Sequence, residues 1–356
     1  MPQGNDMKNG RFTQTVWQRS VRKKLHIKKE ESIWDPSPWE MCSGFETEEG
    51  PSFVWADTQV SGYTARTGYY AVYHAAGELA AKGISAAGVA VRILLPERSS
   101  EECLSDLAEE IQRACSELEI RVTSLDGEVT DGVSRIIVFA SAAGTALKGM
   151  FAGNVSPREH TGQEEILLCG YAGLEGTLRI LETAGEELEA RFVSSFLAQA
   201  ETLTAKLVRP KQLLNATERH VTAMRQIGRG GIFAALWELS GSEGTGFEID
   251  LERITLKQET VEICEHYRLN PYLMTSAGSY LILTREAQAV RELLEQSGVT
   301  VAGLGVSKTQ NARVIRNGEE IRYLDRPARD ELDRWQSSRI KAAHRKGGRE
   351  VSENEK

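Results

Sequence analysis

The hydrophobic positions of the chain switch repeatedly between a two-residue and a helical period. After a polar loop over 35–52, residues 53–59 have the spacing of a strand, and the alanine-rich segment 69–83 has the spacing of a helix ended by glycine. Strands that alternate with helices are typical of an α/β or α+β layer and not of a helical bundle. In the first half of the chain, the predicted strands lie at 53–59, 86–96, 120–125 and 134–144, and the predicted helices at 69–83 and 100–118.

A second series of elements begins after a segment without apolar periodicity. Residues 150–163 are rich in Gly, Ser, Pro and Asn, as at a boundary between domains. We therefore predict a first domain over 31–150 and a second over 165–327. In the second domain, strands are predicted at 164–172, 221–227, 246–254, 279–284, 299–307 and 312–324, and helices at 173–190, 194–206, 209–220, 230–240, 259–267 and 285–298.

Both ends of the sequence are more polar than the parts between them. Residues 1–30 are expected to form a tail and a basic helix, because apolar side chains recur at near-helical spacing among Lys and Arg over 12–29. Residues 335–356 are a charged run, which we expect to be disordered.

Composition narrows the class of protein. With 356 residues, 40% of them hydrophobic and 26% charged, the chain is long enough for two globular domains. The 43 basic and 51 acidic residues give a net charge of −8, so nucleic acid and anionic membranes are not expected partners. No apolar stretch is long enough for a membrane span, and we expect a cytoplasmic protein.

Cysteine and histidine patterns give no metal or disulfide signal. Five cysteines form no C-x-x-C pair, so we expect reduced thiols. The six histidines lack the spacing of a metal site, and the sequence has no P-loop, nucleophile elbow or dinucleotide-binding loop.

Two glycine-bearing segments, AGLEGT (172–177) and GRGG (228–231), each join a predicted strand to a helix. Free N–H groups at a helix N-terminus can bind an anion, and an arginine at such a turn adds positive charge. The glycines can also serve only tight turns and close packing. The candidates for nucleotide or anion binding are Gly173, Gly176, Thr177, Arg225, Arg229, Gly230 and Gly231.

Acidic residues at or after the predicted elements of the first domain are candidates for a magnesium site. Mg²⁺ prefers hard oxygen ligands, and carboxylates near a phosphate site supply them. Each of these residues can equally be a solvated surface group. The candidates are Asp57, Glu78, Asp126 and Glu128.

The second glycine segment lies in a stretch that resembles a known family. VTAMRQIGRGGIFAALWELS (221–240) and the following residues 246–283 are similar to the C-terminal domain of the AIR synthase (PurM-like) superfamily. The resemblance is greatest to AIR synthase-related proteins and to the hydrogenase maturation factor (HypE-like) branch. AGLEGT and the basic segment VWQRSVRKKL (16–25) also resemble AIR synthase-related proteins.

This resemblance implies a fold and partners. It implies a two-domain α+β protein, with an N-terminal domain that dimerises through its sheet and a C-terminal mixed α/β sandwich. ATP and Mg²⁺ would be the cofactors. A homodimer, with a protein partner besides, would be the assembly.

Most of the family's ATP and magnesium motif positions are substituted in this sequence. The motifs G-x-G-E-D, Asn-Asp, G-G-x-T and His-Asp-x-Thr-x-Gly-Gly fall on 37–41, 77–78, 124–127 and 225–231. Met41 stands at the metal-binding aspartate of the first motif and cannot ligate Mg²⁺. Of the last motif only Gly230 and Gly231 remain, whereas Asp57 matches a family aspartate.

Three functions follow as hypotheses. The first is a divergent member with a degenerate ATP–Mg site, which acts as a non-catalytic binding or regulatory module. The second is an active ATP-dependent enzyme that phosphorylates a carbonyl or carboxylate oxygen, with the four acidic candidates as a rearranged magnesium site. The third is a sensor that binds an anionic metabolite at Arg225 and Arg229.

Overall fold

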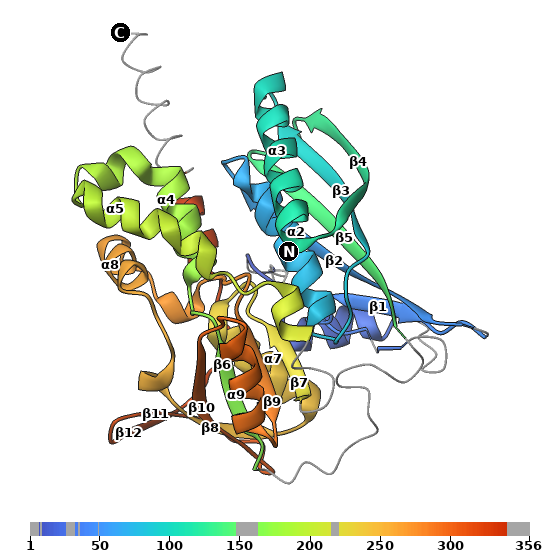
Figure 1. Cartoon of the computed structure of the whole chain (residues 1–356), viewed down its shortest axis with the longest axis vertical. Helices are drawn as coiled ribbons and strands as arrows, with labels where there is room; N and C mark the ends of the chain where they lie inside the picture. The colour runs from blue at the N-terminus through green and yellow to red at the C-terminus, as the bar shows by residue number, and fades with distance from the viewer. Residues whose placement is uncertain are drawn as a thin grey trace, which may run out of the picture.

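The computed structural model describes residues 7, 9–25, 33–34, 36–48, 50–146, 163–214 and 221–339. Two sheets organise these residues, and they lie beside one another (Figure 1). The first sheet has the order β1-β2-β5-β3-β4, and its pairs are antiparallel except for β3 with β4. Its strands are β1 (Cys42–Phe45), β2 (Ser52–Gly62), β3 (Gly88–Pro96), β4 (Arg121–Thr130) and β5 (Ile136–Ala146).

Two helices cover one face of the first sheet. Helix α2 (Arg66–Ala80) is almost wholly buried and packs on β2 and β5, while α3 (Glu101–Leu118) lies against α2 (Figure 1). The Ser100 hydroxyl accepts a hydrogen bond from the amide of Cys103 and caps the start of α3. Side chains of β2 alternate between this covered face and an open face without a helix.

The second sheet carries helices on both faces. Its order is β12-β11-β8-β10-β6-β9-β7. Helix α7 (Gly231–Glu243) packs on one face and α9 (Ala287–Gln296) on the other. The strands are β6 (Glu165–Cys169), β7 (Val221–Gln226), β8 (Gly246–Asp250), β9 (Tyr280–Thr284), β10 (Val301–Lys308), β11 (Arg313–Asn317) and β12 (Glu320–Tyr323).

A further group of helices lies beside the second sheet (Figure 1). It consists of α4 (Leu174–Glu189), α5 (Ser194–Glu201), α8 (Gln258–Tyr267) and the helical residues 331–339, and η2 (Thr202–Lys206) continues α5. A hydrophobic cluster joins α4, α8 and 331–339. Short 3₁₀ turns, η3 (Leu251–Arg253) and η4 (Pro271–Leu273), complete this half, and residues 210–214 are helical.

The fold class predicted from the sequence is confirmed, and three details differ. β1 lies within the segment 35–52 that was predicted as a loop, and it forms because it pairs with β2. The expectation of disorder for 335–356 is wrong for 335–339, where Trp335 is buried in the cluster with α4 and α8. The basic N-terminal helix is a short α1 (Gln14–Trp17) that continues as the π-helix η1 (Gln18–Arg22). Residues 26–32, 147–162, 215–220 and 340–356 lie outside the described part.

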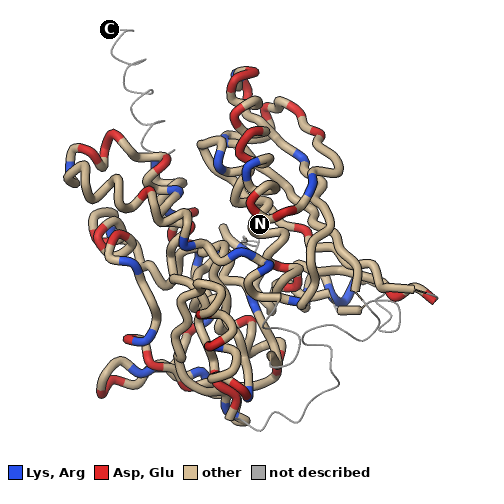
Figure 2. The backbone as a smooth tube through the Cα atoms, viewed as in Figure 1, with Lys and Arg blue, Asp and Glu red and all other residues tan. Residues whose placement is uncertain are grey.

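Charge distribution, helix hydropathy and cysteine state can be compared with the expectations from composition. Lys and Arg positions are interspersed with Asp and Glu over both halves of the molecule (Figure 2). Among the described residues, no helix is both long and apolar enough to cross a membrane. All five cysteines are free thiols, and four of them are buried.

Candidate functional site

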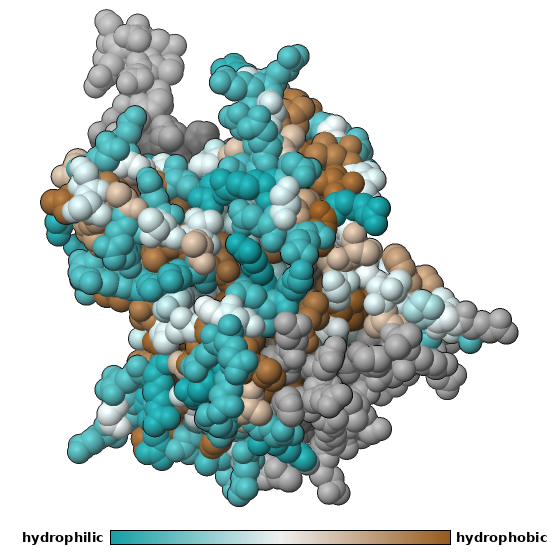
Figure 3. All heavy atoms as spheres, viewed as in Figure 1, coloured by the Kyte–Doolittle hydropathy of each residue, from teal (hydrophilic) through white to brown (hydrophobic). Residues whose placement is uncertain are grey.

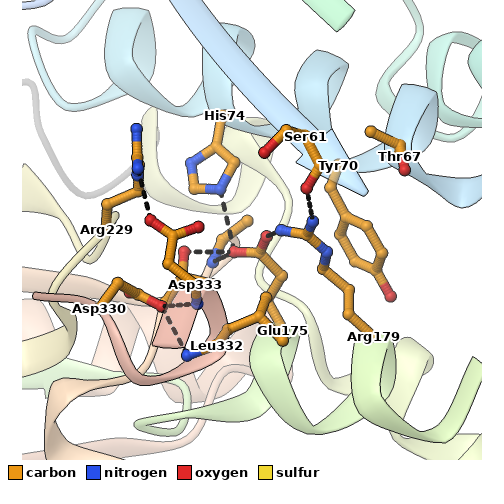
Figure 4. A network of polar contacts seen from close by, with 12 residues as sticks. Ser61, Thr67, Tyr70, His74, Glu175, Arg179, Arg229, Asp330, Leu332 and Asp333 are labelled. Carbon is orange, nitrogen blue, oxygen red and sulfur yellow. Dashed lines mark hydrogen bonds and ion pairs between the residues drawn. The ribbon is translucent and has the colours of Figure 1, made fainter. Parts of the chain in front are cut away.

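A network of charged side chains joins the two halves of the molecule and centres on Glu175, near the start of α4 (Figure 4). This carboxylate is fully buried and lies 2.9 Å from Nε2 of His74 on α2 and 3.0 Å from the guanidinium of Arg179. It also accepts hydrogen bonds from the Thr275 hydroxyl and the Ala277 amide. Burial raises the pKa of Glu175, but the charges and hydrogen bonds of His74 and Arg179 outweigh burial and hold this pKa well below its ordinary value. The network therefore acts as an ionised clamp between the domains.

A second buried cluster surrounds Arg225, at the end of β7. Its guanidinium lies 3.3 Å from Glu238 on α7 and donates a hydrogen bond to the carbonyl of Trp39. Glu40 and Glu78 add negative charge around it, and all of these groups are buried or nearly so. Burial raises the pKa of Glu78, and the charge of Arg225 opposes this shift only in part. Arg225, with Lys82 at Glu40 and Arg11 at Glu238, thus pairs with carboxylates of the chain where the sequence predicted a site for an external anion.

Gln226 fills the space beside Arg225. Its amide nitrogen donates to the carbonyl of His74 and to the carboxylate of Glu78. A β-carbon at Gly77 would lie 2.1 Å from Oε1 of Gln226 and 2.5 Å from the hydroxyl of Tyr280. Gly77 therefore lets α2 approach the second sheet closely, which explains why a glycine stands there.

The glycine turn before α7 already holds a carboxylate. The amide of Gly230 donates to Oδ2 of Asp330 over 2.7 Å, and the other carboxylate oxygen accepts from the Leu332 amide. Burial and the neighbouring charge of Asp333 raise the pKa of Asp330 to about 7, against the hydrogen bond from Gly230. Arg229 at the same turn forms an ion pair with Asp333. The two arginines predicted as anion ligands thus both have carboxylates of the chain itself as partners.

The AGLEGT turn before α4 is buried and its donors are used internally. Gly173 has a positive φ of 71° and is the N-cap. The amide of Leu174 donates to the Ser276 hydroxyl, and that of Gly176 donates to the carbonyl of Thr275. The hydroxyl of Thr177 bonds within the protein as well. These contacts match the alternative in which the glycines serve a tight turn and close packing.

The four acidic candidates for magnesium do not come together. Asp57 lies on the open face of the first sheet, where it accepts from Ser141 and from the Trp55 indole, whereas Glu78 belongs to α2 on the covered face. Asp126 and Glu128 are exposed on β4, two strands beyond the neighbour of β2. The prediction that the four form one site is therefore wrong for this structure. Among the described residues, no three His, Cys, Asp or Glu side chains are grouped so that they could hold a metal ion.

Two cavities are lined in part by Asp330, which bonds to the Gly230 amide. The smaller, about 60 Å³, lies between the domains and is lined by His74, Glu78 and Glu175 among others. The larger, about 880 Å³, lies against the N-terminal half of α7. Arg229 and Asp330 line both cavities.

Sequence reasoning found the two glycine turns but missed the residues that fill the cleft. Glu175 and Arg179 are spaced i, i+4 in an otherwise apolar helix start, a pattern that could have indicated a buried ion pair. Asp330 had no such signal, because it lies 100 residues from its partner Gly230.

Most of the second sheet, with its glycine turn, lies within a segment that matches a known family. Residues 164–315 match the family described as AIR synthase related protein, C-terminal domain. The second domain is therefore similar to this family, as the sequence resemblance predicted.

Its relatives are hydrogenase maturation proteins. A putative hydrogenase expression/formation protein of Methanocaldococcus jannaschii is 24% identical over 272 residues, which are 75% of this chain and 78% of that protein. The HypE of a HypE–HypF complex has a similar fold, with a TM-score of 0.67 at 16% identity over 88% of this chain and 100% of that one. A HypE solved in complex with ATP has a TM-score of 0.62 at 15% identity over 81% and 88% of the two chains.

Proposed function

We propose that the chain is a non-catalytic binding or regulatory module of the superfamily, related to hydrogenase maturation factors, in which ATP–Mg chemistry is lost or strongly weakened. The observation that carries this proposal is the occupied interdomain cleft. Arg229, Asp330 and Asp333 line it with the chain's own charges, and the cavity of about 60 Å³ that remains is far below the ~300 Å³ at which ligand pockets begin.

The donor set also argues against a resident magnesium ion. A hard divalent cation needs several converging oxygen ligands. Asp57 and Glu78 lie on opposite faces of the first sheet, and Glu78 faces Gln226 and Arg225. The guanidinium of Arg225 is buried near Glu78, and its positive charge would repel a magnesium ion there.

Titration with ATP and Mg²⁺ tests this proposal. We expect no magnesium-dependent rise in Tm at millimolar nucleotide, because ATP would have to displace Arg225 and Asp330 from their partners. A relative that binds ATP serves as the positive control, since a ligand at 100 times its Kd adds about 2.7 kcal/mol to the free energy of unfolding.

A magnesium-dependent rise would favour the second candidate, an ATP-dependent enzyme that phosphorylates a carbonyl or carboxylate oxygen. The HypE solved with ATP is the observation that favours this alternative. In that case, Glu78→Ala, which removes a carboxylate that lines the interdomain cavity, should abolish the rise.

Assembly as a homodimer is part of the proposal. The open face of the first sheet carries a group of aromatic rings. The ring centre of Phe53 lies 5.7 Å from that of Phe45 and 5.8 Å from that of Trp55. Phe139 is exposed on β5. Apolar surface is also visible over β3 and β4 in Figure 3. An apolar sheet face without a covering layer is typical of an interface. The HypE–HypF complex supports a protein partner besides, and the free thiols support a cytoplasmic location.

Phe53→Glu should convert the dimer into a monomer, because it would place two charges inside the interface. Sedimentation equilibrium should give about 39.4 kDa for this variant and twice that mass for the unchanged chain. The control is Tyr323→Glu, which changes another exposed aromatic residue on β12. A monomeric unchanged chain, or equal dimerisation of Phe53→Glu, would contradict the proposal.

A further inference from the structure

The strand β4 leaves one edge of the first sheet without a partner. It pairs with β3 on one side, and no other described strand lies beyond it (Figure 1). Most of its residues are exposed, and residues 124–130 pair with β3 in a regular register. Proteins often protect such an edge with lysine or proline, and residues 121–130 contain neither. The edge is therefore open to pairing with a further strand.

One face of this edge is apolar. Leu125 and Val129 lie beside buried residues of β3, so they share the sheet face that α2 and α3 cover. Both reach beyond this cover and are 44% and 57% exposed, and Leu104 on α3 is 41% exposed. Apolar surface is visible beside α3 and β4 in Figure 3. Gly127 stands between Leu125 and Val129 and leaves a gap in this apolar row.

The other face of the edge carries negative charge. Asp126 and Glu128 alternate with the apolar residues and are both exposed. Asp126 pairs with Arg92 over 3.1 Å, but both side chains are largely exposed, so this ion pair is weak. Within the described part of the chain, Glu128 forms no ion pair. Because β4 runs parallel to β3, its end lies near the acidic first turn of α3 (Figure 1).

A second copy of β4 does not suit this edge. If two copies paired antiparallel over 124–130, each Asp126 would lie opposite Glu128 of the other copy. Like charges directly opposite one another destabilise a pair of strands. A strand with basic side chains on one face and apolar side chains on the other would complement both rows.

We propose that the free edge of β4 binds an extended segment of another protein, in which basic and apolar side chains alternate. The basic side chains would lie against Asp126 and Glu128, and the apolar ones among Leu104, Leu125 and Val129. In such strand addition, backbone hydrogen bonds supply affinity and the alternation supplies specificity. The inference rests on the proposed role as a binding module and names the chemistry of its partner. The aromatic group proposed for the homodimer lies on β1, β2 and β5, so the two surfaces use different strands.

Fluorescence anisotropy with a labelled synthetic peptide, Thr-Lys-Leu-Lys-Val-Lys-Thr, tests the proposal on the full chain. We expect saturable binding at least about tenfold tighter than that of the isomer Thr-Lys-Lys-Leu-Val-Lys-Thr. The isomer has the same charge and the same apolar side chains, but it lacks the alternation. Equal binding of the two peptides would show charge attraction alone and would overturn the proposal.

Charge reversal on the edge gives a second arm that a misfolded variant could not imitate. Asp126→Lys/Glu128→Lys should bind the lysine peptide about tenfold more weakly or worse, and should gain binding of the same peptide with glutamate in place of lysine. Glu319→Lys/Glu320→Lys is the matched control, because it reverses two exposed acidic residues at β12 and should keep the original preference. A preference that does not switch in the β4 variant contradicts the proposed surface.

Two N-methylated peptides separate strand pairing from side-chain attraction. Only alternate amides of an added strand point toward β4, so methylation of the lysine amides and methylation of the leucine and valine amides should differ about tenfold or more in Kd. Equal affinities would exclude strand addition.

The mass of the complex distinguishes a foreign segment from a second copy. Sedimentation equilibrium with saturating peptide should give the same number of chains per particle as without it. A fall in that number would mean that a second copy occupies the edge, and would overturn the proposal. None of these outcomes depends on nucleotide, so this inference and the ATP titration can fail or succeed independently.

Discussion

Replacement of Glu175 by glutamine should lower the free energy of unfolding by about 3–5 kcal/mol, the cost of removing one partner from a buried ion pair. The substitution keeps the shape of the side chain but leaves Arg179 and His74 without the carboxylate that lies within 3.0 Å of both. Chemical denaturation at neutral pH measures this loss. Because the clamp joins α2 to α4, the two domains should also lose cooperativity in unfolding.

The pH dependence distinguishes the clamp from a packing effect. The pKa of Glu175 is lowered on folding, so its contribution is present above the ordinary glutamate pKa and is lost as pH falls below it. The difference between Glu175→Gln and the unchanged chain should therefore shrink in acid. Glu186→Gln, an exposed position on the same helix, is the control and should cost less than about 0.5 kcal/mol. A loss that does not change with pH would contradict an ionised clamp.

Arg225→Met should destabilise the chain by about 3 kcal/mol, because it removes the buried cation beside Glu78 and Glu238, although Arg11 and Lys82 still pair with Glu238 and Glu40. Methionine fills a similar volume, so a cavity does not explain the loss. Equilibrium unfolding in urea gives the magnitude.

The loss in this variant should also shrink in acid, but for a different reason. Burial already raises the pKa of Glu78, and loss of the opposing charge of Arg225 would raise this pKa further, so the variant should regain stability relative to the unchanged chain as pH falls and Glu78 takes up a proton. Arg121→Met on the exposed edge of β4 is the matched control. A loss that is equal at all pH values would mean that Arg225 acts through packing alone.

Local patterns predicted the fold well, and distant contacts explain where prediction stopped. The helix α3 was predicted within one residue of its observed bounds, because Ser100 and the acidic first turn are local signals. β1 was missed because its strand conformation depends on pairing with β2. The last helical residues were missed for the same reason, since Trp335 is ordered by α4 and α8 and not by its own neighbours.

In the candidate site too, local features were predicted and contacts with distant residues were not. Glycines at 173, 230 and 231 were recognised from the sequence, and all three have positive φ angles. The partners of the adjacent donors could not be recognised, because Ser276 and Asp330 reach them from about 100 residues away. Arg225 was predicted as a ligand for an external anion, and the fold shows that Glu238 on α7 lies 3.3 Å from its guanidinium.

The Asp330 contact also has a consequence for folding during synthesis. Domains fold in order as the chain leaves the ribosome. The helix α7 would emerge 100 residues before the carboxylate that bonds to the Gly230 amide at its start. Arg135 on the first domain likewise waits for Gln336. The cleft between the domains is thus completed last, and during this interval the nascent protein presents an open glycine turn that the finished protein does not.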